Sequence, residues 1–337
     1  MLNTKKTKKQ HYVPRCYLNR WANEKHQISV FDKLNISEWT TNVYDVASEN
    51  WFYDINQAEL REDVLNLLHQ NGVVPEEDEQ FIEHFFSEEV ENEYAELLRQ
   101  IVDKEITPWY EQNCFFISQE NKFLMSICMV YQYIRTKSSR QSIINSSKCI
   151  EHFLRDINCD EEVIKRHTIQ RQEEKIIQGN MFFDIDHVTE LAEAFCSLTW
   201  ILGINKTNTP LFTSDHPIGT YPHIKESIVS MSGIGSRGVE AYFPLSPNHI
   251  LIMFDADYHI GIKGHDRKYV LLTDKEDVER YNRLCAYNSG QYVFSNEPGF
   301  SLVKIMIKDN PNIFSLPKTT LSYGGKTYTS TRMEDCQ

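Results

Sequence analysis

The spacing of apolar residues divides the chain into a helical middle with strand-like segments on either side. Between about residues 58 and 202, apolar side chains recur mostly at intervals of three and four, which is the spacing of one face of an α-helix. Residues 121–138 are apolar around most of the circumference of such a helix, which predicts a central, well-buried helix. Residues 161–178 and 187–202 are predicted to complete the helical block.

Shorter apolar segments outside this block predict strands. Residues 28–32 alternate between apolar and polar, and we expect residues 42–46 to pair with them. Further strands are predicted at residues 209–213, 242–245, 250–254 and 291–295, and a helix capped by Thr273 or Asp274 at residues 274–288. We therefore expect an α+β fold with a mainly helical middle and a C-terminal mixed or antiparallel sheet that the N-terminal segment joins.

The balance of acidic and basic residues bears on whether the chain binds nucleic acid. The chain carries 35 Lys and Arg against 48 Asp and Glu, a net charge of −13 with neutral His. This balance argues against a surface coated with non-specific nucleic-acid contacts, but it is compatible with one local basic groove. Lys5, Lys6, Lys8 and Lys9 form a short basic arm, which is either a solvated tail or an arm that contacts phosphate.

Other sequence features limit the cellular compartments and the cofactors that we expect. No run of about 18 apolar residues occurs, so we expect no membrane span. The charged N-terminus lacks the apolar stretch of a secretory signal, and the eight cysteines have neither Cys-x-x-Cys nor zinc-finger spacing. We therefore expect a cytoplasmic protein with reduced thiols and no zinc site. The chain also has no Walker A or dinucleotide-binding motif, so nothing predicts a nucleotide cofactor.

Residues 10–21 contain the first candidate for chemistry. They read Gln-His-Tyr-Val-Pro-Arg-Cys-Tyr-Leu-Asn-Arg-Trp, and His11 lies just before a proline at which the chain can turn. Imidazole titrates near neutrality, so His11 is suited to act as a base, an acid or a metal ligand. In the alternative, His11 hydrogen-bonds backbone and fixes the N-terminal segment. The sequence favours neither interpretation.

The second candidate is the run Ser214, Asp215 and His216, which ends a predicted strand and precedes Pro217. Strand ends collect functional groups because the sheet holds them rigid while the loop gives access. Asp215 is suited to bind a metal or act as a general base, His216 to transfer protons, and Ser214 to donate a hydrogen bond. In the alternative, Asp215 caps its own backbone in an Asx-turn.

The third candidate is Gln132 with Arg135 on the predicted central helix. A spacing of three places both side chains on one face, and they must be partnered if they are buried. The guanidinium of Arg135 would suit a phosphate or a carboxylate. A structural pair with Glu91 or Glu88 is the alternative, which we slightly favour.

Taken together, the motifs resemble a known family. They are the opening motif at residues 10–18, Gln132 with Arg135, Thr-Ser-Asp-His-Pro at 213–217, Phe-Pro-Leu-Ser-Pro at 243–247, and Asn288. In this order they resemble the bacterial domain-of-unknown-function family numbered 4238, over nearly the whole chain. The resemblance implies a bacterial or phage-related intracellular protein in which these motifs belong to one domain. It supplies no catalytic assignment.

The length of 337 residues would suit two domains, at roughly 100–200 residues for each, but the resemblance favours one. We expect a single domain over residues 1–310. Its helical block covers about residues 58–202, and its sheet-rich part covers about residues 203–310 plus 10–55. Residues 311–337 are expected to form a polar tail that frays.

The leading functional hypothesis from the sequence is a metal-dependent phosphodiesterase or nuclease, used as a bacterial defence or toxin effector. His11, Asp215 and His216 are the expected catalytic groups, and Asp215 is the expected ligand of Mg²⁺ or Mn²⁺. Contacts to a nucleic-acid or nucleotide substrate are expected from Gln10, Arg15, Gln132, Arg135, Ser214 and Asn288.

The alternative is a non-enzymatic sensor or interaction module with a protein partner. In that case the same residues tie the N-terminal segment to the sheet. The positions of His11 and Asp215 distinguish the two hypotheses. An enzyme is favoured if both line one open pocket, and a module is favoured if both are buried and paired with backbone.

Overall fold

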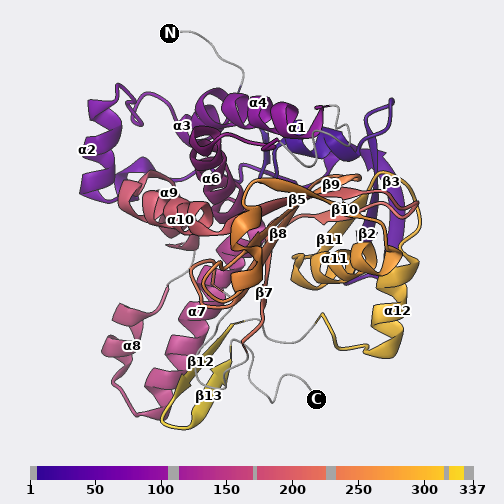
Figure 1. Ribbon diagram of the computed structural model, residues 1–337. Helices are drawn as coiled ribbons and strands as arrows, with labels where there is room; N and C mark the ends of the chain where they lie inside the picture. Colours follow the sequence, from indigo (N-terminus) through magenta and orange to yellow (C-terminus); the bar gives the residue numbers. More distant parts are fainter. Residues whose placement is uncertain (1–5, 105–113, 170–172, 225–232, 315–318, 330–337) are drawn as a thin grey trace.

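Five short, apolar strands build the larger of the two main sheets (Figure 1). The computed structural model describes residues 6–104, 114–169, 173–224, 233–314 and 319–329. The strands lie in the order β10-β5-β9-β8-β7, and β10 is parallel to β5 while the other neighbours are antiparallel. Their bounds are β5 Thr199–Asn205, β7 Gly219–Pro222, β8 Val239–Ser246, β9 His249–Phe254 and β10 Lys268–Leu272. Every residue of β8 is buried, as in a strand covered on both faces.

The N-terminal segment joins the second sheet, as expected. This sheet is antiparallel in the order β3-β2-β11-β6, so the early strand β2 pairs with the late strand β11. Its strands are β2 Gln27–Asp32, β3 Ser37–Asn42, β6 Thr213–Ser214 and β11 Tyr292–Ser295. Two smaller ribbons pair β1 Lys9–His11 with β4 Ser48–Asn50, and β12 Thr320–Tyr323 with β13 Lys326–Thr329. The fold is therefore α+β.

Helices fill the middle of the chain. They are α1 Arg15–Leu18, α2 Glu62–Gln70, α3 Phe81–His84, α4 Glu91–Val102, α6 Gln119–Ile134, α7 Lys137–Asp156, α8 Glu161–His167, α9 Glu173–Phe183 and α10 Ile185–Ser197. Later in the chain come α11 Lys275–Asn288 and α12 Ser301–Asp309. Single turns of 3-10 helix are η1 Asn19–Trp21, η2 Val43–Asp45 and η3 Gln57–Glu59, with a longer one at η5 Ile260–His265 and a π-helical turn at η4 Phe85–Val90.

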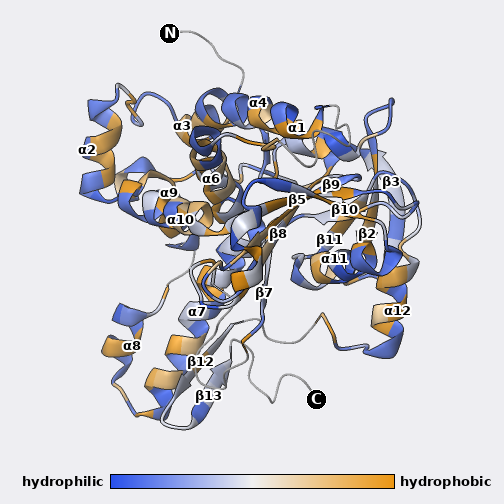
Figure 2. Ribbon diagram, in the orientation of Figure 1, coloured by the Kyte–Doolittle hydropathy of each residue, from blue (hydrophilic) through white to orange (hydrophobic). Residues whose placement is uncertain are grey.

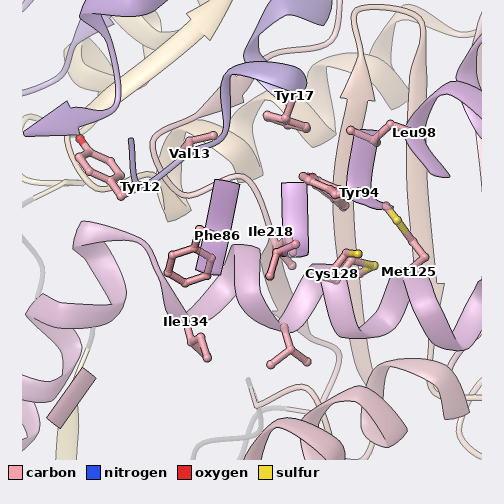
Figure 3. Packing of buried hydrophobic residues seen from close by; sticks show 14 of the residues in the cluster. Tyr12, Val13, Tyr17, Phe86, Tyr94, Leu98, Met125, Cys128, Ile134 and Ile218 are labelled. Atoms are coloured by element: carbon pink, nitrogen blue, oxygen red, sulfur yellow. The ribbon is translucent and has the colours of Figure 1, made fainter. Parts of the chain in front are cut away.

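Helix α6 lies in the main hydrophobic core, which confirms the predicted central helix. Its residues Met125, Cys128 and Ile134 are buried there. In Figure 3 the side chains of Tyr94 and Phe86 lie between α6 and the opening segment of the chain. Hydrophobic residues also follow β8 and β9 in Figure 2. The core therefore joins the helical block to the larger sheet.

Several sequence predictions were wrong at element boundaries. The central helix expected over residues 121–138 ends at Ile134, the helix expected over residues 161–178 is divided between α8 and α9, and the strand expected over residues 209–213 is only Thr213–Ser214.

The helix expected over residues 187–202 ends at Ser197, and Thr199–Asn205 is β5, which pairs with strands on both sides. The aromatic and β-branched residues of β5 suit a strand. Pairing with two neighbouring strands therefore overrides the helical spacing of its apolar residues. The partner of β2 is Ser37–Asn42 rather than residues 42–46, because Val43–Asp45 is a 3-10 turn.

The predicted polar tail is folded in part. Strands β12 and β13 form a hairpin that packs on α7, and α7, α8 and this hairpin extend away from the sheets in Figure 1. His152 on α7 hydrogen-bonds the carbonyl of Thr329 at 2.8 Å. Within the described ranges, no helix has the length and apolar character needed to cross a membrane.

The hydroxyl of Tyr17 connects the two main sheets. It donates a hydrogen bond to the carbonyl of Pro244 on β8 at 2.6 Å and lies 2.5 Å from the hydroxyl of Thr213 on β6. Tyr17 is fully buried, so water cannot replace either bond. The opening motif therefore fixes the relative position of the sheets.

Removing that hydroxyl should destabilise the fold. Tyr17→Phe leaves the Pro244 carbonyl without its buried donor, and we expect the free energy of unfolding to fall by about 1–3 kcal/mol. Urea denaturation followed by circular dichroism measures it. Tyr323→Phe is the control, because Tyr323 is 66% exposed. Equal midpoints for the two variants would contradict the role of Tyr17.

Candidate functional site

Arg135 is the centre of a buried polar cluster. It caps the C-terminus of α6 and is 1% exposed. Its Nη2 donates to the carbonyl of His11 at 2.7 Å and to Glu91 Oε1 at 2.9 Å, and its Nε donates to the Tyr53 hydroxyl at 2.9 Å. Burial lowers the pKa of Arg135, but Tyr53 and Glu91 more than offset this and raise it. The expected Arg–carboxylate pair is confirmed, with Glu91 as the partner.

Gln10 and His11 are held beside this cluster. The Gln10 amide donates to Asp54 at 2.7 Å and accepts from the Tyr53 backbone N–H at 2.7 Å. His11 is 8% exposed, and burial together with the charge of Arg15 lowers its pKa to about 4. The imidazole is therefore neutral at pH 7 and cannot supply a proton as a general acid there.

Two of the three lysines of the basic arm that the structure describes pair with acids. Lys6 pairs with Glu79, and Lys9 pairs with Asp45 at 2.5 Å, while Lys5 lies outside the described residues. Arg15 is exposed, and its guanidinium lies 5.7 Å from the centre of the Tyr44 ring. The arm therefore offers less free positive charge for a phosphate than its sequence suggests.

Gln132 is buried beside Arg135 without a partner for its amide. It is 1% exposed, and neither its Oε1 nor its Nε2 has a hydrogen-bond partner among the described residues. A substrate would have to enter the core to reach it. The expected contact between Gln132 and a substrate stays a prediction.

The carboxylate of Asp215 accepts hydrogen bonds from three backbone N–H groups. Its Oδ1 accepts from the N–H of Gly290 at 2.8 Å, and its Oδ2 accepts from Gln291 at 2.7 Å and Tyr292 at 3.1 Å. The residue is 3% exposed. Burial raises the pKa of its carboxyl above the ordinary value, and the N–H donors act in the opposite direction. Asp215 thus connects the end of β6 to the start of β11.

The neighbours of Asp215 also bond to the protein. Ser214 donates to the carbonyl of His216 at 2.8 Å and accepts its N–H at 3.1 Å, which makes a tight turn. The Nδ1 of His216 lies 2.8 Å from the Thr136 hydroxyl. The amide of Asn288 donates to the Tyr242 hydroxyl at 2.7 Å.

The structure brings the separated motifs together at the end of α6. Arg135 holds the His11 carbonyl, and the next residue, Thr136, holds the His216 ring. His11 and Asp215 are both buried, and Asp215 is paired with backbone. Asp215 therefore meets the criterion for a module, whereas the Nε2 of the buried His11 has no hydrogen-bond partner among the described residues, so the criterion is met only in part.

The residues described here contain no group of three or more His, Cys, Asp or Glu side chains placed to hold a metal ion. The carboxylate of Asp215 faces N–H donors, whereas Mg²⁺ needs several oxygen ligands. A metal at Asp215 stays a prediction that this geometry does not support.

A polar groove that the sequence did not reveal lies where the opening helices meet the turn between β8 and β9. It consists of two hollows of about 460 and 330 Å³ that share Val102, Thr207, Asn248 and His249. The polar side chains that line it include Arg20, Lys104, Lys206, Asn208, Asn248 and His249. We call this the polar groove.

Local hydrogen bonds shape the polar groove. Asn205 donates to the carbonyls of Thr209 at 2.7 Å and Pro247 at 3.3 Å, so the loop after β5 is fixed against the turn after β8. His249 Nδ1 lies 2.9 Å from the Ser246 hydroxyl, and burial lowers the pKa of His249 to about 4. Arg20 pairs with Asp103 at 2.6 Å.

A second cluster that the sequence did not reveal surrounds Glu240 on β8. Its carboxylate accepts from Arg280 at 2.7 and 2.8 Å, from Tyr281 at 2.9 Å, and is bonded to His223 Nε2 at 2.7 Å. Glu240 is buried, while the side chain of His223 is 29% exposed. Burial raises the pKa of Glu240, but its hydrogen bonds and the charge of Arg280 outweigh burial, so the pKa is lower than usual.

Sequence signals for these two sites were weak. Ser246 and Pro247 stood out only as part of the motif at residues 243–247, and Arg20 belongs to the opening segment without standing out in it. Glu240, His223 and Arg280 lie in separate elements, so only the folded sheet brings them together.

One comparison with known proteins gave a match. The profile of a family described as proteins of unknown function, DUF4238, matches residues 9–299. No curated protein and no solved structure matches the chain.

Replacing the Asp215 carboxylate should destabilise the fold. In Asp215→Asn the amide nitrogen would face at least one of the three backbone N–H donors, and a charge-assisted acceptor is lost. We expect the free energy of unfolding to fall by about 3 kcal/mol. Urea denaturation measures it, and Asp257→Asn, on a side chain that is 87% exposed, is the control. Unchanged stability with lost biological activity would instead identify a catalytic carboxylate.

Stability should also depend on His11 below pH 6.5. Its pKa is near 6.5 when unfolded and about 4 when folded, so the unfolded chain binds the proton first. The free energy of unfolding should fall as pH drops from 6.5 towards 4, by up to about 1.4 kcal/mol per pH unit from this group. His11→Asn should remove that part of the slope. Parallel stability curves for the two proteins between pH 7 and pH 5 would refute the assignment.

Proposed function

The chain belongs to the DUF4238 family of proteins of unknown function, and from this premise we propose that it is a ligand-binding module whose ligand carries a phosphate group. The motifs that mark the chain build its frame, and the ligand binds in the polar groove. The observation that carries the proposal is the groove itself. Basic side chains line it together with amides, hydroxyls and the carboxylate of Glu297, next to the opening motif.

The motif residues are engaged with the protein. Arg135 and Asp215 each make three hydrogen bonds to protein groups, and Tyr17 makes two. Groups used in this way cannot bind a substrate without breaking buried hydrogen bonds, which is costly. This supports a framework role for the motifs.

The groove has the chemistry that a phosphate ester requires. Arg20, Lys104 and Lys206 are cations, and Lys206 has no ion-pair partner within the described part of the chain. Asn208 and Asn248 can donate hydrogen bonds to phosphate oxygens or sugar hydroxyls. A volume of about 460 Å³ in one hollow is sufficient for a mononucleotide-sized ligand.

The groove is better suited to binding than to acid–base catalysis. Its histidine, His249, has a pKa lowered to about 4 by burial, whereas an efficient general base has a pKa near the working pH. Binding without turnover is therefore the function that we propose for this site, as in a sensor.

A phosphodiesterase or nuclease is our second candidate, because one arrangement favours it. The ring of His223 is partly exposed and is oriented by the buried carboxylate of Glu240, as is common for catalytic histidines. A role as a defence or toxin effector would rest on this candidate. RNA and DNA incubated with Mg²⁺ or Mn²⁺ should then be degraded by the wild type, but not by His223→Gln or in EDTA.

Calorimetric titration with AMP, ATP and pyrophosphate tests the binding function. We expect at least one of the three to bind with a Kd below about 1 mM. Lys206→Ala should weaken that binding about tenfold, because a charge-assisted hydrogen bond is lost. Lys263→Ala is the control, since Lys263 is exposed and does not line the groove. The absence of binding by all three probes would reject the proposal.

A further inference from the structure

A third hollow lies next to the polar groove. This hollow has a volume of about 750 Å³ and shares Lys104 with the groove. It is lined by the end of α4, by residues 114–119 and by Arg267. We propose that the three hollows form one track that binds single-stranded nucleic acid. This inference rests on the proposed function, because the polar groove is one end of the track.

Basic side chains follow the track along its length. Arg20 lines the first hollow, Lys206 the second, Lys104 the second and third, and Arg267 the third. The acid beside Arg267 is largely engaged elsewhere: Asp266 accepts from the buried Lys122 at 2.9 Å. In a chain with a net charge of −13, a row of cations along neighbouring hollows, of which Arg20 also pairs with Asp103, favours a ligand with several phosphates.

An exposed aromatic ring lies at the far end of the track. Phe115 is 48% exposed and lines the third hollow. The guanidinium of Arg267 lies 4.2 Å from the centre of its ring, and the ammonium of Lys268 lies 4.5 Å from it. Proteins that bind single strands combine such a stacking surface for a base with cations for the adjoining phosphates.

The same arrangement disfavours a duplex. Bases in a duplex are stacked on one another, so their faces are not accessible to Phe115. A single strand can bend into successive hollows and expose a base at the third one. Gln100 and Asn121 also line the third hollow. Asn121 donates to Gln100 at 3.0 Å and Gln100 donates to Glu96 at 2.8 Å, so a base edge or sugar hydroxyl would exchange with these exposed bonds.

Fluorescence anisotropy with labelled ten-nucleotide strands, dT10 and rU10, tests the inference. We expect at least one strand to bind more tightly than the labelled mononucleotide does. Phe115→Leu keeps an apolar side chain but removes the stacking surface, so it should weaken strand binding about tenfold. Binding of the mononucleotide, which needs only the polar groove, should not change. Tyr323→Leu is the control, as an exposed aromatic residue on the β12–β13 hairpin.

Salt dependence gives a second readout. Four phosphate contacts predict that the logarithm of the association constant falls with the logarithm of salt concentration with a slope of about −3. Lys104→Ala should make this slope shallower by about 0.7, the contribution of one contact. The melting temperature of each variant shows that it is folded.

The outcomes separate this inference from the proposed function. If mononucleotides bind but strands bind no more tightly, the track is rejected and the proposed function stands. If neither binds, both are rejected. Tighter binding to a ten-base-pair duplex, or equal competition by polyglutamate, would also reject a track for single strands. If Phe115→Leu weakens the binding of strands but not of mononucleotides, the track is supported.

Discussion

The buried guanidinium of Arg135 is the constraint on which the rest of the structure depends. A cation at the core of a protein must be fully paired, and here a backbone carbonyl, a tyrosine hydroxyl and a carboxylate surround it. Those partners come from β1, from the loop after β4 and from α4, so one side chain fixes three segments against α6. Arg135 thereby fixes the opening motif, and Tyr17 of that motif hydrogen-bonds to both sheets.

This arrangement explains why polar motifs that suggest chemistry can instead define a frame. Arg135, Asp215 and Tyr17 are buried, and buried polar groups must find partners within the fold. Each therefore joins elements that are far apart in sequence. In the function that we propose, the ligand contacts their neighbours instead, such as Arg20, which is one helical turn after Tyr17 and lines the polar groove.

The sequence predicted the parts of the fold that depend on local patterns. The apolar helix around residue 128, an N-cap at Thr273 or Asp274, and a carboxylate partner for Arg135 follow from spacing and from the cost of a buried charge, and the structure selects Asp274 and Glu91. The first four residues of β5 were mistaken for helix, because pairing with two neighbours decides their conformation. The polar groove and the Glu240 cluster were missed because their residues come from loops and strands that only the folded chain brings together.

The central claim is that the motifs build the frame while the polar groove binds the ligand. Arg135→Lys tests it most directly, because it keeps the charge but loses the planar geometry that reaches three partners. The account predicts a fall of about 3 kcal/mol or more in the free energy of unfolding. Below the melting temperature, affinity for the nucleotide should remain within about twofold, a difference of 0.4 kcal/mol. Wild-type stability combined with lost binding would contradict the account.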